Sequence, residues 1–341
     1  MTEPLPLPDL VLFGKAKPRT ILPVVDHYAG SEKTIARALL LQQEMGAETG
    51  LPLFDVTCDC EDGAKTGAEA AHATMCAHLI AGAENRFGRV GIRIHDVTHP
   101  HWETDLQIAL EIAGEKLAFI TFPKARSVSD FARQIGRLRE LEASLGLQRA
   151  IPIHALIETH GALRDVWQIA TLDGVESLDF GLMDFVSDHR GAIPASAMQS
   201  PDQFSHPLIV RAKSEVAAAA HAVGIPPGHN ISMELENTDS IFADARRARQ
   251  EFAFLRMWSI HPNQIRPILE AMRPDLSEIH VAADILLEAE ASGWGPIRHQ
   301  GRLHDRGSYR YYWDLLCRAR VTGIALPEEI RRRFWRDDGQ K

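Results

Sequence analysis

Two carboxylates, Glu158 and Asp184, are spaced so that they could bind one metal ion. Glu158 follows the apolar run 153–157, and Asp184 follows another run, 178–182, about one strand-and-helix repeat further along the chain. On adjacent parallel strands they would repel each other unless one were protonated or a cation lay between them. Two oxygen ligands, with other positions left to water and substrate, are typical of Mg²⁺. The spacing therefore predicts a site for Mg²⁺ or Mn²⁺; the alternative is that both side chains cap helices.

Arg93 ends another short apolar run and is a candidate for binding a substrate. Its planar guanidinium suits a carboxylate or phosphate, which it can hold through two hydrogen bonds. The alternative is an ion pair with Asp59 or Glu61. An arginine beside a metal ion is typical of a site for an oxyacid.

Short apolar runs, each followed by a helical pattern, explain how these residues could meet. The predicted strands are 20–25, 55–60, 90–94, 118–122, 153–157, 178–182, 230–235 and 257–260. Eight such units predict a (β/α)₈ TIM barrel over residues 15–272. Helical patterns dominate after His261-Pro262, so residues 273–341 are predicted to form a C-terminal helical extension.

Charged residues follow nearly every predicted strand, at the end where such barrels carry their active sites. In chain order they are Asp26 and His27; Asp59, Glu61 and Asp62; Arg93 and His95; Lys124; Glu158; Asp184; Glu234 and Glu236; and His261. Strands commonly end where polar loops begin, but a charged group after nearly every run is harder to explain in that way. We therefore expect an active site at this end of the barrel.

Composition excludes several other classes of protein. The chain has 37 Lys and Arg against 46 Asp and Glu, and its net charge of −9 disfavours binding to nucleic acid or to an anionic membrane. No apolar run reaches the roughly 18–20 residues of a membrane span, and the first residues lack the pattern of a secretory signal. We expect a cytoplasmic protein with a small-molecule substrate.

Cysteine and histidine patterns do not predict a further metal site. The four cysteines, Cys58, Cys60, Cys76 and Cys317, match neither a disulfide framework nor a CxxC pair. The 95–101 histidine cluster has no zinc-site spacing. The chain also lacks a P-loop, a GxSxG elbow and a dinucleotide-binding glycine pattern, which disfavours kinases, serine hydrolases and NAD enzymes.

Six motifs in order resemble the HpcH/HpaI aldolase and citrate lyase β-subunit (CitE-like) superfamily, near the malyl-CoA and citramalyl-CoA lyases. The resemblance spans about residues 19–310. The motifs are Asp59-Cys60-Glu61-Asp62-Gly63-Ala64, Arg93, Pro123-Lys124-Ala125, Ile157-Glu158-Thr159 with Gly161, Gly181 with Asp184, and Ile260-His261-Pro262-Asn263-Gln264-Ile265.

The resemblance implies a Mg²⁺-dependent carbon–carbon lyase acting between a 2-oxo acid and an acyl thioester such as acyl-CoA. It implies that Glu158 and Asp184 bind the metal and that Arg93 binds a carboxylate. Lys124 and His261 are predicted to bind substrate. The acidic motif, Asp59, Glu61 and Asp62, is implied to orient metal-bound water or to act in acid/base catalysis.

The C-terminal region carries a further implied catalytic group. The stretch from Gly301 to Asp305 resembles the family's GxMxD motif, whose aspartate reaches a neighbouring subunit's site, so we expect a homo-oligomer, a trimer or a multiple of one. The apolar residues of the tail, such as Ile279 and Leu286, also need a covering surface; packing across the chain's own barrel is the alternative.

Departures from the family pattern fall near the expected substrate and thioester arm. They are His95, Gly307, and the stretches 26–30 and 253–257. Two other functions stay open: hydrolysis of a hydroxyacyl-CoA thioester, and a citrate lyase-like subunit working with an acyl carrier protein. The extended tail with Asp305 favours a stand-alone enzyme.

Overall fold

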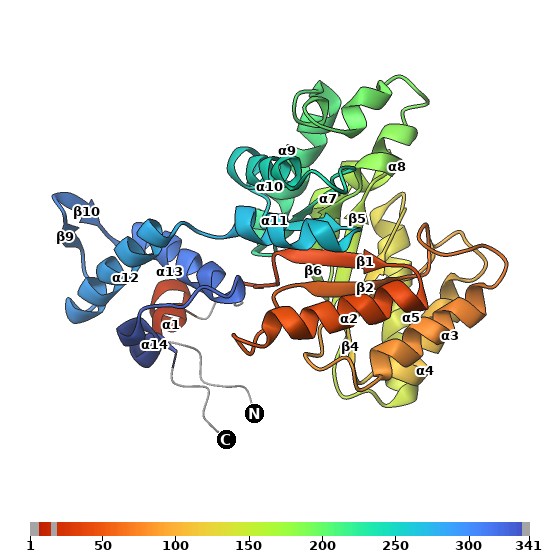
Figure 1. Ribbon diagram of the computed structural model, residues 1–341, viewed down its shortest axis with the longest axis horizontal. Coiled ribbons are helices and arrows are strands. Elements are labelled where there is room, and N and C mark those ends of the chain that lie inside the picture. Colours follow the sequence, from red (N-terminus) through yellow and green to blue (C-terminus); the bar gives the residue numbers. More distant parts are fainter. Residues whose placement is uncertain (1–6, 15–18, 336–341) are drawn as a thin grey trace. The chain divides into compact units, whose positions relative to one another are not determined.

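The computed structural model describes residues 7–14 and 19–335 (Figure 1). Residue contacts divide the chain into two compact units. One is Leu22–Met272; the other combines the described parts of Met1–Ile21 and Arg273–Lys341. In the part of the chain described, no helix is both long and apolar enough to cross a membrane.

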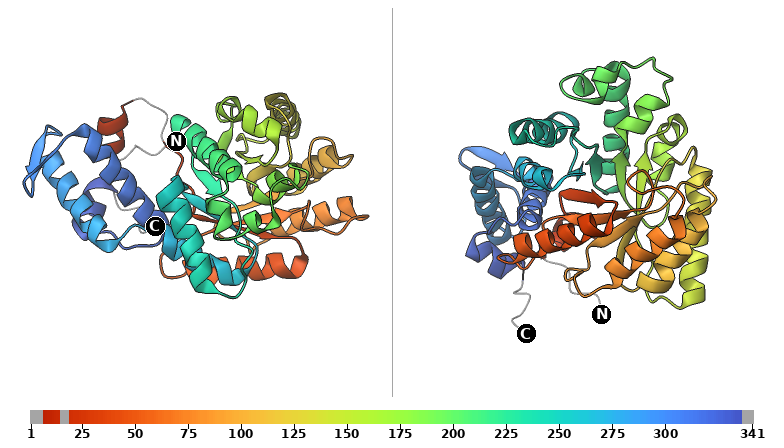
Figure 2. Two further views of the ribbon diagram at one scale, coloured as in Figure 1. Left: turned by 90° about the horizontal axis from the view of Figure 1, so that it is seen from above. Right: turned by 45° about the vertical axis from the view of Figure 1, so that its right-hand side comes forward.

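Residues 22–272 form a closed barrel of eight parallel strands in sequential order, which confirms the predicted (β/α)₈ fold. The strands are β1 (Val25–Ala29), β2 (Asp55–Asp59), β3 (Val90–Arg93), β4 (Leu117–Phe122), β5 (Ile153–Ile157), β6 (Val175–Phe180), β7 (Pro227–His229) and β8 (Arg256–Ser259). Pairing of β1 with β8 closes the barrel. Helices surround the strands (Figure 2).

The barrel helices connect successive strands. They are α2 (Glu32–Gly46), α3 (Glu69–Ala81), α4 (Trp102–Ala113), α5 (Val128–Leu145), α6 (His160–Arg164), α7 (Val166–Ile169), α8 (Leu182–Ser187), α9 (Pro207–Val223), α10 (Thr238–Phe252) and α11 (Pro262–Met272). Two 3₁₀ turns, Ala195–Met198 and Asp202–Phe204, lie between α8 and α9. Ser31 caps α2 by accepting a hydrogen bond from the Thr34 amide, and α9 ends at Gly224 with a left-handed φ of 78°.

Two strands lie elsewhere than the apolar runs predicted. The first strand is Val25–Ala29 rather than 20–25, so Asp26 and His27 lie within it and not beyond its end. The seventh is Pro227–His229 rather than 230–235, which leaves Glu234 and Glu236 in the following loop. Both strands contain residues that seldom indicate a strand, namely buried charges in β1 and proline and glycine in β7.

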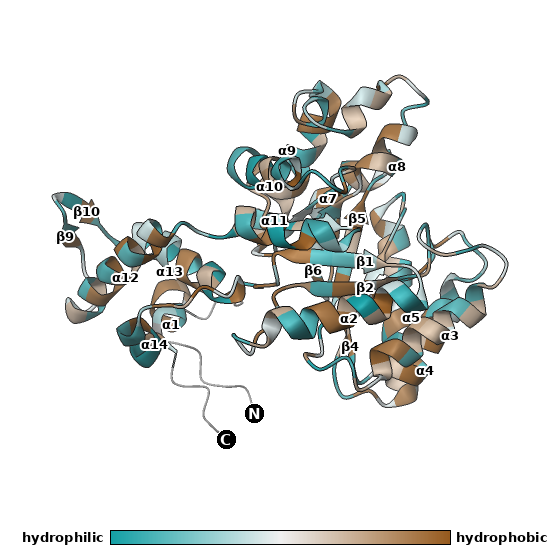
Figure 3. Ribbon diagram, in the orientation of Figure 1, coloured by the Kyte–Doolittle hydropathy of each residue, from teal (hydrophilic) through white to brown (hydrophobic). Residues whose placement is uncertain are grey.

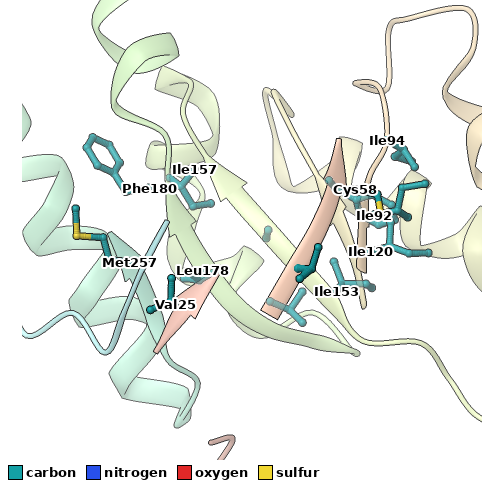
Figure 4. Close-up of a cluster of buried hydrophobic side chains, with 14 of the residues drawn as sticks. Val25, Cys58, Ile92, Ile94, Ile120, Ile153, Ile157, Leu178, Phe180 and Met257 are labelled. Atoms are coloured by element: carbon teal, nitrogen blue, oxygen red, sulfur yellow. The ribbon is translucent and has the colours of Figure 1, made fainter. Parts of the chain in front are cut away.

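Polar and apolar residues alternate along the strands because successive side chains face opposite sides of a sheet. The apolar positions form the barrel's main hydrophobic cluster (Figure 4), with Val25, Ile92, Ile153, Leu178 and Met257 among its members. The positions between them carry buried charges, including Asp26, Asp55, Asp179, His154 and Arg256. One face of the strands is therefore apolar, and the other carries these charges together with a few apolar side chains, namely Tyr28, Leu156 and Trp258.

Arg256 links these buried charges. It is fully buried; Nη2 donates to Asp55 Oδ2 at 2.6 Å and lies 3.8 Å from Asp26 Oδ2, while Nε donates to the Pro23 carbonyl at 2.8 Å. Arg89 binds the Asp55 carboxylate from a second side through two hydrogen bonds. These contacts offset the cost of taking the carboxylates out of water.

The second unit contains α1 (Leu7–Phe13), α12 (Leu276–Ala291), α13 (Arg306–Val321), α14 (Glu328–Phe334) and a hairpin of β9 (Ile297–His299) and β10 (Arg302–His304). The three C-terminal helices agree with the helical pattern, whereas α1 and the hairpin were not predicted. Trp313 Nε1 donates to Asp9 at 2.7 Å, which ties α1 to α13. Barrel and C-terminal helices alike carry both hydrophilic and hydrophobic residues (Figure 3).

The apolar residues of α12 are covered inside this second unit. Ile279 and Leu286 are buried in a cluster that also contains Leu12, Trp313 and Ile330. The uncovered tail surface that we used to argue for a homo-oligomer is therefore not present, because α1, α13 and α14 cover it. The expected oligomer rests on the family resemblance alone.

Replacing Arg256 with methionine should destabilise the barrel strongly. The change keeps bulk but leaves the buried Asp55 and Asp26 carboxylates short of their cation, which costs about 3–5 kcal/mol in comparable sites. Urea unfolding followed by circular dichroism measures the change in free energy of unfolding. Arg37→Met, at a half-exposed ion pair with Glu44, is the control and should change it by less than about 0.5 kcal/mol. Equal losses in the two variants would contradict this account.

Candidate active site

A pocket of about 400 Å³ opens where the barrel strands end. Five of the predicted site residues line it: Asp59, Asp62, Arg93, Glu158 and Asp184. Its other lining residues are Tyr28, Gly30, Gly63, Gly181, Leu182, Met183, Asn230, Ile231, Trp258 and Ile260. The structure therefore brings together residues from the first half of the barrel and from β5 to β8.

Arg93 and Asp59 form a two-pronged ion pair at the base of this group. Arg93 Nε donates to Oδ1 at 2.7 Å and Nη2 donates to Oδ2 at 2.6 Å, while Nη1 lies 3.0 Å from Glu61 Oε2. The pair follows from the strand register, because Asp59 ends β2 directly beside Arg93 at the end of β3. The ion pair that was the alternative for Arg93 is thus present, and its binding of a substrate carboxylate stays a prediction.

Lys124 connects the acidic side chains of the site. Its Nζ lies 2.9 Å from Glu61 and from Asp62, and 3.6 Å from Asp184. Its backbone amide donates to Glu158 Oε1 at 2.7 Å. Lys124 has a φ of +49°, a region that side chains other than glycine seldom occupy and that is typical of functional sites. This turn allows one residue to serve four carboxylates.

Two glycines allow carboxylates to lie against the backbone. A Cβ at Gly181 would lie 2.3 Å from Glu158 Oε2, and one at Gly63 would lie 2.4 Å from Asp59 Oδ2. The Gly63 amide instead donates to that Asp59 oxygen at 2.8 Å. Both glycines are required by the position of an acid rather than by a turn.

An apolar wall, formed by Tyr28, Trp258, Ile231 and Ile260, faces the same pocket. The Tyr28 and Trp258 rings stack with their centres 4.8 Å apart, and the Arg93 guanidinium lies 5.2 Å from the centre of the Tyr28 ring. This wall was not predicted from the sequence. The alternation of side chains along a strand could have predicted it, because Tyr28 and Trp258 lie two residues after Asp26 and Arg256 and therefore face the same side.

Comparison with known proteins relates this geometry to a family. Residues 42–262 match the family model "HpcH/HpaI aldolase/citrate lyase". The chain belongs to this family. An L-malyl-CoA/β-methylmalyl-CoA lyase of Rhodobacter capsulatus is 24% identical over 247 residues, which is 69% of this chain and 77% of the relative.

Solved structures agree with this membership. A citrate lyase from Burkholderia xenovorans is 49% identical with a TM-score of 0.83, covering 95% of this chain and 99% of that one. A CitE protein from Mycobacterium tuberculosis, solved with magnesium, acetoacetate and coenzyme A, shares the fold at 19% identity and a TM-score of 0.63, covering 87% and 98%. This member of the HpcH/HpaI family is an enzyme of the carbon–carbon lyase class.

Burial shifts the pKa values of the acids in this pocket. Glu158 is 2% exposed; burial and the nearby Glu61 and Asp184 raise its pKa to about 8. Burial also raises the pKa of Glu61 to about 6, against the effect of two neighbouring cations, and raises that of Asp184. Burial opposes ionisation of Asp59 as well, but Arg93 outweighs it and the pKa of Asp59 is lowered.

These residues fit a hard divalent cation. The site has five carboxylates but only two cationic side chains, Arg93 and Lys124. The carboxylates belong to Asp59, Glu61, Asp62, Glu158 and Asp184. Burial raises the pKa values of Glu158 and Glu61, and a dication would offset the excess of negative charge that remains when these acids ionise. Among the described residues no three carboxylates converge into a full cage. Glu158 and Asp184, after the paired strands β5 and β6, therefore suit an ion that keeps positions for water and substrate.

Four predicted site residues lie outside the pocket lining: Glu61 and Lys124, which contact the acids that line it, and His261 and Asp305. His261 follows Ile260 and precedes α11, where its Nδ1 accepts a hydrogen bond from the Asn263 amide at 3.3 Å. Asp305 belongs to the second unit and caps α13, accepting from the Gly307 amide at 2.9 Å. The substrate role of His261 and the acid/base role of Asp305 stay predictions.

Gly181→Ala should disturb the site without unfolding the barrel. A methyl group there would displace the Glu158 carboxylate, so we expect affinity for Mg²⁺ to fall about tenfold or more, or about 1.4 kcal/mol. Isothermal titration calorimetry measures the affinity. Gly136→Ala in helix α5 is the matched control, because nothing lies within 4 Å of the place that its added methyl group would occupy. If both variants bound Mg²⁺ like the wild type, the packing of Glu158 against Gly181 would not matter for metal binding.

Proposed function

We propose that this protein is a Mg²⁺-dependent lyase that cleaves, or forms, a carbon–carbon bond between a 2-oxo acid and an acyl-CoA thioester. The observation that carries the proposal is the cluster of five carboxylates around Arg93 and Lys124, four of which line the pocket. Such a pocket suits a metal ion and an anionic oxyacid together. The Rhodobacter relative, named for malyl-CoA and β-methylmalyl-CoA, supports a CoA ester as the substrate class.

Glu158 and Asp184 would hold the Mg²⁺ ion. Bound there, the ion would supply Lewis-acid stabilisation of negative charge on substrate oxygens, worth several kcal/mol. The Lys124 amide fixes one Glu158 oxygen, and Gly181 gives the other room. The orientation of Glu158 therefore comes from two neighbouring backbone segments.

Arg93 would orient the carboxylate of the oxyacid. Its Nε and one N–H of Nη2 are bound to Asp59, so substrate contact falls to the second N–H of Nη2 and to Nη1, which lies 3.0 Å from Glu61 Oε2. Asp59 thus acts as a positioning residue that prevents the guanidinium from turning. A lysine at position 93 could not make both contacts.

Asp62, paired with Lys124, is placed to accept a proton during the reaction. Asp62 lines the pocket with its carboxylate 2.9 Å from Lys124 Nζ, so it can accept the hydroxyl proton of a hydroxyacyl substrate. After the carbon–carbon bond breaks, the thioester enolate needs a proton donor. We assign that step to Asp305 of a second copy of the chain.

The apolar wall would receive the hydrocarbon part of the substrate. Tyr28, Trp258 and Ile231 offer ring and aliphatic surface opposite the acidic group. A pocket of about 400 Å³ suits a small oxo acid and the acyl group, but not the whole of coenzyme A. We infer that the acid or acyl partner carries an alkyl substituent.

Asp184→Asn should abolish most lyase activity, because it removes a charged ligand from an ion with few protein ligands. A screen of hydroxyacyl-CoA substrates measures kcat/KM, and we expect a loss of about 100-fold or more. Asp173→Asn is the control, since this exposed residue precedes β6 at the opposite end of the same strand. Free CoA without an oxo acid among the products would show a thioester hydrolase instead of a lyase.

Mixing inactive variants tests the proposed role of Asp305. Asp305→Ala and Glu158→Ala chains, each inactive alone, should recover partial activity after subunit exchange, because some sites would then pair an intact metal site with an intact aspartate. Exchange is verified by labelled subunits in native mass spectrometry. Absence of recovery after verified exchange would confine Asp305 to its own chain or remove it from the mechanism.

A further inference from the structure

Three residues that the lyase site does not use converge on the helix side of β2. Cys60 follows this strand, and His72 and Cys76 lie four residues apart, one turn, on α3. One ligand atom from each lies within 4.8 Å of the others. Within the described ranges, no other group of three or more His, Cys, Asp or Glu side chains is close enough to hold a metal ion.

One ring nitrogen of His72 is bound to the backbone. Its Nε2 lies 2.8 Å from the Asp59 carbonyl oxygen, which can only accept a hydrogen bond. Nε2 therefore carries a proton. The contact with Cys76 raises the pKa of His72 to about 9, so a metal ion bound at Nδ1 would displace the second ring proton. Histidines that bind metals commonly donate their other ring N–H to a carbonyl or carboxylate in this way.

Cys76 is the centre of the sulfur contacts. Its Sγ lies within 4.8 Å of a ligand atom of Cys60 and of His72, and Cys58, Cys60 and Cys76 are all buried. The hydrogen bonds from Cys58 and Cys60, followed by that from His72, lower the pKa of Cys76 against the effect of burial. The thiolate is the form that binds metals.

We propose that Cys60, His72 and Cys76, with Cys58 as the fourth ligand, form a site for a thiophilic metal ion of the Zn²⁺ type. Three sulfurs and one imidazole nitrogen are a standard tetrahedral zinc set. With Zn–S bonds of about 2.3 Å, neighbouring ligands sit about 3.8 Å apart, so Cys60, His72 and Cys76, whose ligand atoms lie within 4.8 Å of one another, would contract by about 1 Å or less. The thiols distinguish this site from the all-oxygen lyase site, which suits Mg²⁺.

An ion here would strengthen the element that carries the acidic motif. It would join α3 to the end of β2, and His72 would still hold the Asp59 carbonyl. Asp59 in turn binds Arg93 in the pocket. The proposed ion therefore has a structural role on the outer side of the strand whose inner side faces the substrate.

Titration of the metal-free full-length chain with Co²⁺ tests the proposal, because thiolate ligands give Co²⁺ an intense charge-transfer absorption in the near ultraviolet. We expect about one Co²⁺ per chain with this absorption, displaced by Zn²⁺. Cys76→Ser should lose the band. Cys317→Ser, a buried cysteine in the second unit, and Glu158→Gln, in the lyase pocket, should keep it.

Folding of each variant is checked by circular dichroism. If Cys76→Ser does not fold, His72→Ala replaces it, because His72 is only partly buried, and Co²⁺ affinity should fall about tenfold or more. Absence of the band in the wild type, or a full band in Cys76→Ser, would overturn the proposal. Free thiols are also counted in the denatured, unreduced protein. Two free thiols instead of four would show a disulfide in place of a metal site and would also overturn the proposal.

Discussion

Burial of charged side chains on the inner face of the strands is the constraint on which the rest of this barrel depends. A TIM-barrel interior is usually filled by branched apolar residues. Here Arg256 must satisfy Asp55 and Asp26, and Arg93 must satisfy Asp59, because an unpaired ion at these depths would cost several kcal/mol. The strand register aligns the partners, so the ionic pairs and the barrel geometry specify each other.

The lyase pocket extends this arrangement and leaves it incomplete. Deeper acids form ion pairs with Arg256 and Arg89, whereas carboxylates outnumber basic side chains where the strands end, and burial raises the pKa of Glu158 to about 8. Lys124 and Gly181 position the acids through the backbone. Lys124 has a left-handed backbone conformation, and Gly181 has no side chain that would clash with the Glu158 carboxylate. The same pocket sets acid against the stacked Tyr28 and Trp258 rings, which accords with a substrate that is anionic at one end and apolar at the other.

Strand β2 connects the two sites we describe. Alternation along the strand turns Asp55 and Asp59 toward the barrel interior and Cys58 toward the helices, with Cys60 following the strand near α3. The hydrogen bond from His72 to the Asp59 carbonyl joins the thiol group to the acidic motif. The segment Cys58-Asp59-Cys60-Glu61-Asp62 thus contributes thiols to the helix side of the barrel and carboxylates to its interior. These residues are adjacent in the sequence, and only the fold separates them into two sites.

The sequence by itself determined the barrel, six of its eight strands and the acids at their ends, because apolar runs and strand-end charges are local patterns. The sequence placed β1 and β7 wrongly, because residues in these strands depend on partners far away in the chain. Asp26 in β1 pairs with Arg256. Gly228 in β7 is required because a Cβ there would lie 1.8 Å from the Asp179 carboxylate. Only the tertiary structure decided that Arg93 is bound to Asp59, that α1 covers the C-terminal helices, and that Cys60, His72 and Cys76 meet. Each of these depends on contacts between separate elements, which no local period encodes.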